Sequence, residues 1–236
     1  MIQDSGLNFT DHLDELRKRF LIALFAVGLS AVMSFFFSNV LIQLLTAPIE
    51  KYVDHLYFLS PYEAFLMKLK ISLVSGIILS SPILFSQLWH FVSPGLYASE
   101  KRIVLPLILI STALFILGVL FAYFLVVPIS LSFFLGFQTP SLVPLISIGS
   151  YVSFLLSLIL VFGIVFDFPV LLVGLISLNV VSTSFLKAQR KTAVILLLIL
   201  AAVLTPTVDI FTQLLLAIPL WGLFELSILI GGWLKQ

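Results

Sequence analysis

The sequence predicts an all-α integral membrane protein with six transmembrane helices in a concave bundle. Residues 103–166 contain no Asp, Glu, Lys or Arg, and a soluble fold would need charged surface turns in so long a stretch. Hydrophobic residues make up 61% of the chain and charged residues 10%, with a mean hydropathy of +1.24. The 236 residues suffice for about five to seven spans of roughly 20 residues each.

Apolar windows place the spans within one transmembrane domain, 1–236, and give their order along the chain. The predicted spans are 20–37, 71–92, 103–127, 148–178, 192–204 and 211–234. Spans five and six are expected to be short, because about 13 apolar residues rise only about 20 Å against a hydrocarbon core of about 30 Å. Pro82, Pro169 and Pro219 lie inside spans two, four and six, where we expect bends.

The polar start of the chain predicts a helix that leads into span one, since Leu13, Leu16 and Phe20 form an apolar stripe. Residues 1–14 are acidic and polar, unlike the basic beginning of a cleavable signal sequence, so we expect span one to be retained. Six spans place both termini on one side, which carries nine of the twelve basic residues. The positive-inside rule therefore predicts cytoplasmic termini. Residues 42–65, with Pro48 and Pro61, should form an external cap.

Composition also limits the possible partners and cofactors. The net charge is +1 and the basic residues are scattered in twos and threes, so we expect no nucleic-acid partner. The absence of Cys removes disulfides and sulfur-ligated metals. His55 and His90 show no metal-ligand spacing, and we expect neither a metal nor another cofactor.

Asp167 interrupts the fourth apolar span. A carboxyl surrounded by lipid should be neutral or hydrated by a cavity, and this makes Asp167 a candidate functional residue. The alternative is an inert hydrogen bond between helices. Asp209, just before span six, is a candidate helix N-cap. Glu225 is expected to be hydrated or paired within the protein, and its role is left open.

Several short segments of the chain, in this order, resemble the TatC family, the multi-span receptor of the twin-arginine protein translocase. The resemblance covers about residues 9–234. Its segments are HLDELRKR at 12–19, SPI at 81–83, FVSPGLY at 91–97 with Glu100, FAYF at 121–124, LTP at 204–206 with Asp209 and Gln213, and AIP at 217–219.

The resemblance implies a non-catalytic receptor in the bacterial cytoplasmic membrane. Such a receptor binds signal peptides with consecutive arginines on folded cargo, recruits TatA/TatB-type single-span partners, works as a homo-oligomer and uses the proton-motive force. The matching positions for the signal peptide are Glu15, Arg17, Phe91 and Glu100. Carboxylates are suitable partners for a guanidinium pair, because they can accept two parallel hydrogen bonds. For Glu15 the alternative is favourable interaction with the helix dipole alone.

By the same resemblance, Thr205 and Gln213 belong to the docking region for a partner's transmembrane helix. The alternative for Gln213 is a hydrogen bond within its own bundle. Asp167 stands where the family commonly has Glu. The shorter side chain argues against a role that needs long reach, but it leaves a role in admitting water.

Three other classes of function fit the sequence less well. A secondary transporter could use Asp167 as a proton-coupling carboxyl, but the two halves of the chain show no convincing repeat. An intramembrane enzyme would need a nucleophile with a base, a metal cluster or paired aspartates within the spans, and the sequence offers none. A structural scaffold would leave Asp167 and the cytoplasmic carboxylates without a role.

Overall fold

The computed structural model describes residues 9–53, 55–92, 104–139, 143–177, 180–207 and 209–233, with side chains from residue 13 onward. Regular structure in these ranges is helical, apart from isolated β-bridge residues, among which Tyr57 pairs with Ser147. The elements are α1 (Phe9–Phe36), α2 (Ser38–Thr46), α3 (Glu63–Val92), α4 (Val104–Phe121), a π-helical segment (Ala122–Val126), α5 (Val127–Leu135), α6 (Ile148–Phe166), α7 (Phe168–Ser177), α8 (Thr183–Ala188), α9 (Arg190–Leu204) and α10 (Ile210–Trp233).

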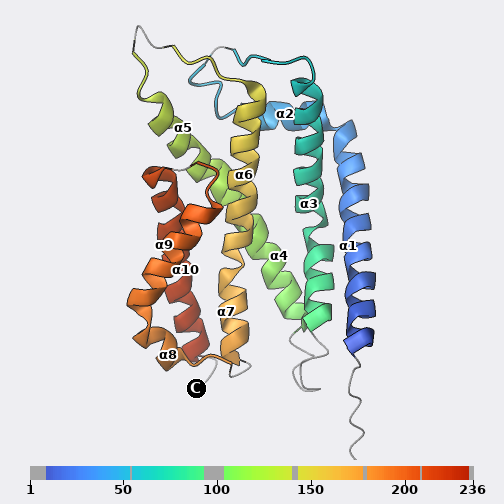
Figure 1. Ribbon diagram of the computed structural model, residues 1–236, viewed down its shortest axis with the longest axis vertical. Coiled ribbons are helices and arrows are strands. Elements are labelled where there is room, and N and C mark those ends of the chain that lie inside the picture. Colours follow the sequence, from blue (N-terminus) through green and yellow to red (C-terminus); the bar gives the residue numbers. More distant parts are fainter. Residues whose placement is uncertain are drawn as a thin grey trace, which may run out of the picture.

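Five helical stretches in the described part of the chain are long and apolar enough to cross a membrane, which confirms the predicted class. They are Leu13–Phe36, Glu63–Val92, Val104–Leu135, Ile148–Ser177 and Ile210–Trp233. The long helices lie roughly along one axis, and the beginning of α1 and the end of α10 lie at the same end of the bundle (Figure 1). We call this end, where α8 also lies, the terminal end, and the opposite end the cap end.

The two spans that were expected to be short differ in the structure. Helix α9 has 15 residues and rises about 22 Å, less than a hydrocarbon core of about 30 Å. The prediction of a short span six is wrong, because α10 has 24 residues and rises about 36 Å. Helix α10 continues through Pro219, and Glu225 within it is neutralised by Arg190, whose Nη2 lies 2.7 Å from a carboxylate oxygen. Neither Pro219 nor Glu225 ends α10.

The third span is longer than predicted, since it continues past Val127 to Leu135. Pro128 lies in the first turn of α5, directly after the π-helical segment. A proline ring collides with the carbonyl one turn earlier in a regular α-helix, and the wider π turn relieves this conflict. The α4–α5 stretch crosses the bundle obliquely (Figure 1).

The fourth span is interrupted at Asp167, as its sequence predicts. Helix α6 ends at Phe166 and α7 begins at Phe168. Pro169 has no amide hydrogen to donate to the carbonyl of Val165. The backbone N–H of Asp167 donates to the carbonyl of Ile164 at 3.1 Å and also faces that of Val165. By contrast, α3 continues through Pro82.

Glycines allow the closest helix contacts. A Cβ added at Gly76 in α3 would lie 2.7 Å from the backbone nitrogen of Ala31 in α1, and one at Gly118 in α4 would lie 2.4 Å from the carbonyl oxygen of Phe162 in α6. Helix association in a membrane depends on such close packing, because lipid tails are as apolar as the side chains. These two positions therefore fix how α1 lies on α3 and how α4 lies on α6.

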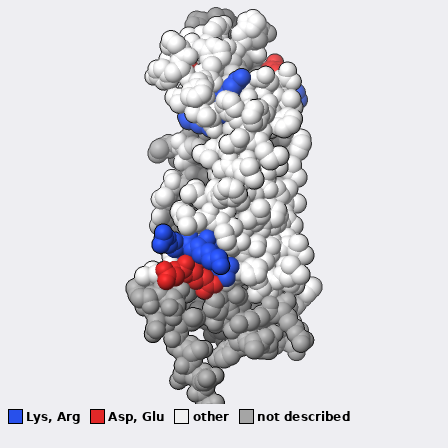
Figure 2. Space-filling view, turned by 90° about the vertical axis from the view of Figure 1, so that its right-hand side faces the viewer, with Lys and Arg blue, Asp and Glu red and all other residues white. Residues whose placement is uncertain are grey.

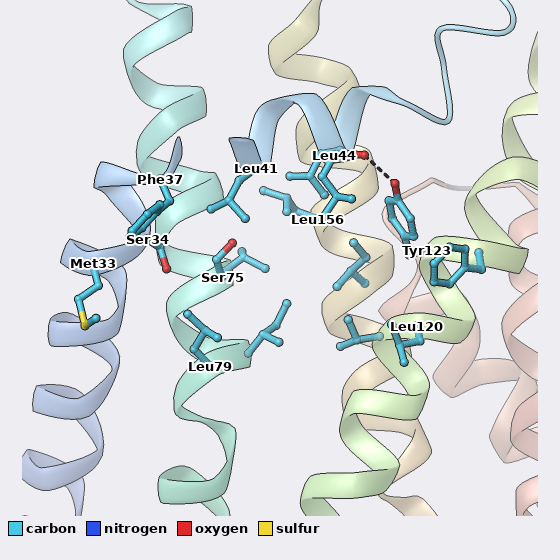
Figure 3. A pocket seen from close by; sticks show the side chains of 16 residues that line it. Met33, Ser34, Phe37, Leu41, Leu44, Ser75, Leu79, Leu120, Tyr123 and Leu156 are labelled. Carbon is cyan, nitrogen blue, oxygen red and sulfur yellow. Dashed lines mark hydrogen bonds between the residues drawn. The ribbon is translucent and has the colours of Figure 1, made fainter. Parts of the chain in front are cut away.

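Helix α2 lies across the cap end (Figure 1), where two tyrosines hold it. The hydroxyl of Tyr123 donates to the carbonyl of Leu44 at 2.6 Å, and that of Tyr151 to the carbonyl of Leu45 at 2.7 Å. Below α2 is an apolar cavity of about 480 Å³, with side chains from α1, α3, α4, the π-helical segment and α6 around it (Figure 3). Pro48, a predicted cap residue, lies half-buried in the turn after α2, beside the fully buried Ile49.

Candidate functional site

The terminal end of α1 carries an ion pair within the predicted signal-peptide site. Arg19 donates to Glu15 Oε1 through Nε at 2.9 Å and through Nη2 at 2.5 Å. The residues are one helical turn apart, with the acidic one first, which is the favourable order on a helix. Both side chains are about one-quarter exposed. Beside the pair is a polar hollow of about 340 Å³, which also has Asp14 and Lys18 in its wall.

Of the other three residues predicted for this site, the structure describes Arg17 and Phe91. Arg17 lies exposed on α1, and Phe91 lies half-buried in the last turn of α3. Because the two helices run antiparallel with Ala31 opposite Gly76, steps of about 15 residues bring Leu16 and Phe91 to a similar level. Glu100 lies outside the described residues.

Charged side chains gather near the two ends of the face on which α1 lies. Figure 2 shows basic and acidic groups close together towards the terminal end, further charges at the cap end, and an uncharged surface between them. Large apolar side chains of α1 are exposed, among them Phe25, Leu29 and Val32. A surface of this kind suits hydrocarbon rather than water.

Asp167 is buried, with 8% of its surface exposed, and its Oδ1 has no hydrogen-bond partner among the described residues. The residue lines a mainly apolar cavity of about 410 Å³ between α3, α4, α6 and α7. In the same cavity wall, Trp89 Nε1 donates to Ser111 Oγ at 3.0 Å. An unsatisfied buried oxygen costs free energy. Among the described residues this oxygen therefore makes no inert hydrogen bond between helices.

The predicted partner-docking residues lie where α9 meets α10. Gln213 Nε2 donates to the carbonyl of Leu198 in α9 at 3.0 Å, so its amide nitrogen is satisfied within the bundle. Thr205 is buried at the end of α9. No hydrogen bond between the side chains of Thr205 and Gln213 is present among the described contacts.

Asp209 caps α10. Its Oδ1 accepts a hydrogen bond from the backbone N–H of Thr212 at 2.8 Å, and its Oδ2 accepts one from the Thr212 hydroxyl at 2.6 Å. Partial burial alone raises the pKa of Asp209, but hydrogen bonds from Thr212, with smaller ones from Thr207 and Phe211, outweigh it and leave this pKa below its usual value. The ionised carboxylate is therefore the form that the cap favours.

Replacing Asp209 with Ala should lower the free energy of unfolding by about 1 kcal/mol through loss of the cap, whereas Asn should largely preserve it. Since the folded-state pKa is depressed, the contribution of the charge is complete above the unfolded-state pKa of about 3.9 and is lost as pH falls through the folded-state pKa. Unfolding in detergent at neutral and acidic pH measures this effect. An equal acid-dependent loss in D209N and the unmodified chain would contradict it.

Sequence reasoning did not single out Glu63, which has the densest set of hydrogen bonds among the described carboxylates. It accepts from the backbone N–H groups of Leu59 at 2.6 Å, Ser60 at 3.3 Å and Gly149 at 2.8 Å, and from the hydroxyl of Ser147. A local signal exists, because Ser60 and Glu63 have the spacing of a capping box. The contacts to Ser147 and Gly149, 84 and 86 residues away, have no such signal.

The fold and these sites together define a polytopic helical membrane protein in which polar side chains connect different helices. The described residues include no cluster of three or more His, Cys, Asp or Glu able to hold a metal ion. The sequence model of the family described as "Sec-independent protein translocase protein (TatC)" matches residues 11–219. The chain therefore belongs to the TatC family.

Individual relatives agree over nearly the whole chain. The TatC protein of Carboxydothermus hydrogenoformans is 38% identical over 234 residues, covering 99% of this chain and 96% of that protein. The TatC protein of Aquifex aeolicus is 40% identical, covering 94% and 93%. A crystal structure titled twin arginine translocase receptor TatC, in the detergent DDM, superposes with a TM-score of 0.84 at 39% identity, covering 93% of this chain and 99% of the other.

Membership of the family establishes a multi-pass membrane protein that is a component of a Sec-independent protein translocase and not an enzyme. It does not favour the solute-transporter interpretation, in which Asp167 would couple proton movement to uptake of a small molecule.

Proposed function

We propose that this chain is the receptor subunit that binds twin-arginine signal peptides at the cytoplasmic face, through Glu15, Arg17, Phe91 and Glu100. The observation that carries the proposal is the contact of Arg19 with Glu15, in which two guanidinium nitrogens donate to the carboxylate. A carboxylate that holds one arginine in this way has the position and exposure needed to hold an arginine of a peptide. The polar hollow beside it leaves room for such a peptide.

The proposed topology has six spans, with α9 as the short fifth span and both termini in the cytoplasm of a bacterial cell. Support comes from the common end of the bundle at which α1 begins and α10 ends (Figure 1). Three basic residues lie close to that end: Lys187 in α8, and Arg190 and Lys191 at the beginning of α9. Cytoplasmic segments of membrane proteins carry an excess of Lys and Arg, so this distribution favours a cytoplasmic location for that end.

Single-span partners of the TatA/TatB type are proposed to dock around Thr205 and Gln213. The amide nitrogen of Gln213 is used by Leu198, and its amide oxygen remains the group that can accept a hydrogen bond from a polar side chain of a partner helix. The working complex would contain several copies of this chain and would export folded cargo with energy from the proton-motive force. Asp167, buried with an unsatisfied oxygen, would draw water into the membrane interior.

The decisive test is binding of a synthetic twin-arginine signal peptide to the purified full-length chain. Glu15→Gln and Glu100→Gln should each weaken binding about tenfold or more, since each removes a charged hydrogen-bond acceptor. Glu50→Gln is the matched control, because Glu50 lies exposed after α2 at the cap end and should leave binding unchanged. Equal affinity of all three variants and the unmodified chain would reject the proposed site.

A further inference from the structure

The carboxylate proposed to hold a peptide arginine is already in contact with an arginine of its own helix. Arg19 Nε and Nη2 both donate to Glu15 Oε1, and no other hydrogen bond to the Glu15 side chain is present among the described contacts. Arg19 and Glu15 also lie in the wall of the same polar hollow. A peptide guanidinium that approaches through this hollow therefore meets Glu15 already bound to the guanidinium of Arg19.

We propose that Arg19 is an affinity-determining residue that acts as an internal competitor for the twin-arginine signal peptide. This inference rests on the proposed function, since it concerns the same carboxylate. Before a peptide arginine can bind Glu15 with two parallel hydrogen bonds, Arg19 must leave Oε1. The free receptor thus exists mainly in the paired state, and the peptide binds the smaller population in which the pair is open.

The size of the effect follows from the stability of the pair. The apparent affinity of a ligand falls by the fraction of receptor that is competent to bind. Partly exposed ion pairs one turn apart on a helix are weak. We therefore expect the pair to lower the affinity for the signal peptide by only about two- to fivefold. Such a pair does not block the site. It lowers the affinity of the resting receptor, which favours release of the signal peptide after transport.

An internal competitor has a thermodynamic signature that a positioning role lacks. It reduces by the same factor the affinity of every ligand that needs both oxygens of this carboxylate, because the cost of opening the pair is independent of the ligand. Removing Arg19 should therefore strengthen binding of a twin-arginine peptide more than that of the weaker twin-lysine peptide, whose ammonium lacks the planar donor pair and can bind the other carboxylate oxygen alone. If Arg19 instead held Glu15 in a productive orientation, its removal would weaken both.

The test compares Arg19→Gln with Lys18→Gln. Both variants remove one positive charge from the same side of α1, and both residues lie in the wall of the hollow, so general electrostatic attraction of a cationic peptide changes alike. We expect R19Q to bind a fluorescent twin-arginine peptide about threefold more tightly than K18Q does. R19K, which keeps the charge but lacks the planar donor pair, should lie between R19Q and the unmodified chain.

A double-variant cycle separates the possible outcomes. In an E15Q background, R19Q should bring no gain over K18Q, because no carboxylate remains for Arg19 to occupy. If E15Q weakens peptide binding but R19Q binds no more tightly than K18Q, the internal competitor is refuted and the proposed site stands. If E15Q leaves binding unchanged, the proposed site and the competitor are both refuted. A gain in affinity by R19Q cannot result from misfolding, which would only reduce binding.

Discussion

Replacement of Gly118 by alanine is expected to lower the free energy of unfolding by about 1–3 kcal/mol, the usual cost of overpacking a well-packed interior. The added Cβ would lie 2.4 Å from the carbonyl oxygen of Phe162 and 2.9 Å from the Cβ of Phe166. The first of these is a backbone atom of α6, which cannot change rotamer to make room. Helices α4 and α6 must therefore move apart, and contacts along both helices are lost.

Gly222 provides the matched control for Gly118. It lies inside α10, and a Cβ added there meets nothing within 4 Å. Because alanine is the better helix former, Gly222→Ala should be neutral or stabilising by up to about 1 kcal/mol. Unfolding of both variants in detergent, followed by circular dichroism, gives the comparison. Equal stability of G118A and G222A would show that the α4–α6 contact does not limit helix packing.

Replacement of Glu63 by alanine is expected to make the segment before α3 and the beginning of α6 more mobile at the cap end. Four donors lose their acceptor at once, from the segment before α3 and from the beginning of α6. The pairing of Tyr57 with Ser147 connects the same two segments, so both connections should loosen together. We expect amide exchange at Leu59 and Gly149 to accelerate about tenfold or more, while amides in the middle of α6 keep their protection.

Glu63→Gln separates charge from shape, since its amide oxygen still accepts hydrogen bonds but only as a neutral group. Its exchange rates should lie between those of E63A and the unmodified chain. Glu50→Ala is the control for removing a carboxylate at this end, because Glu50 is exposed and, among the described residues, accepts one hydrogen bond, from the hydroxyl of Thr46 at 3.2 Å. Unchanged exchange at Gly149 in E63A would contradict the role given to Glu63.

The local part of the candidate site could be predicted from the sequence more fully than it was. The pair of Glu15 with Arg19 has the i, i+4 spacing of a helical ion pair, and Ser60 with Glu63 has the spacing of a capping box. Asp209 was identified as a helix cap from its position before an apolar helix. Each of these contacts depends only on neighbouring turns of one chain segment.

Contacts between distant segments were not predictable in this way. The donation of Gln213 to Leu198 depends on the angle between α9 and α10, and the length of the third span depends on a π-helical segment that absorbs Pro128. The expectation of a short span six was wrong because α10 continues without a break through Pro219 and Glu225, as one helix of 24 residues. Arg190, from another helix, pairs with Glu225, which lowers the cost of a charge inside an apolar helix.

The sequence by itself determined the membrane class, most of the apolar spans and the family, because hydrophobicity over about 20 residues decides whether a segment enters lipid and because short motifs survive in linear order. Only the tertiary structure decided which polar groups are hydrogen-bonded and to which partners. Among the described residues, Asp167 Oδ1 has no partner, whereas the Glu63 carboxylate accepts from four donors. The physical reason is that backbone donors and acceptors are the same at every position, so helix packing alone selects which of them a side chain meets.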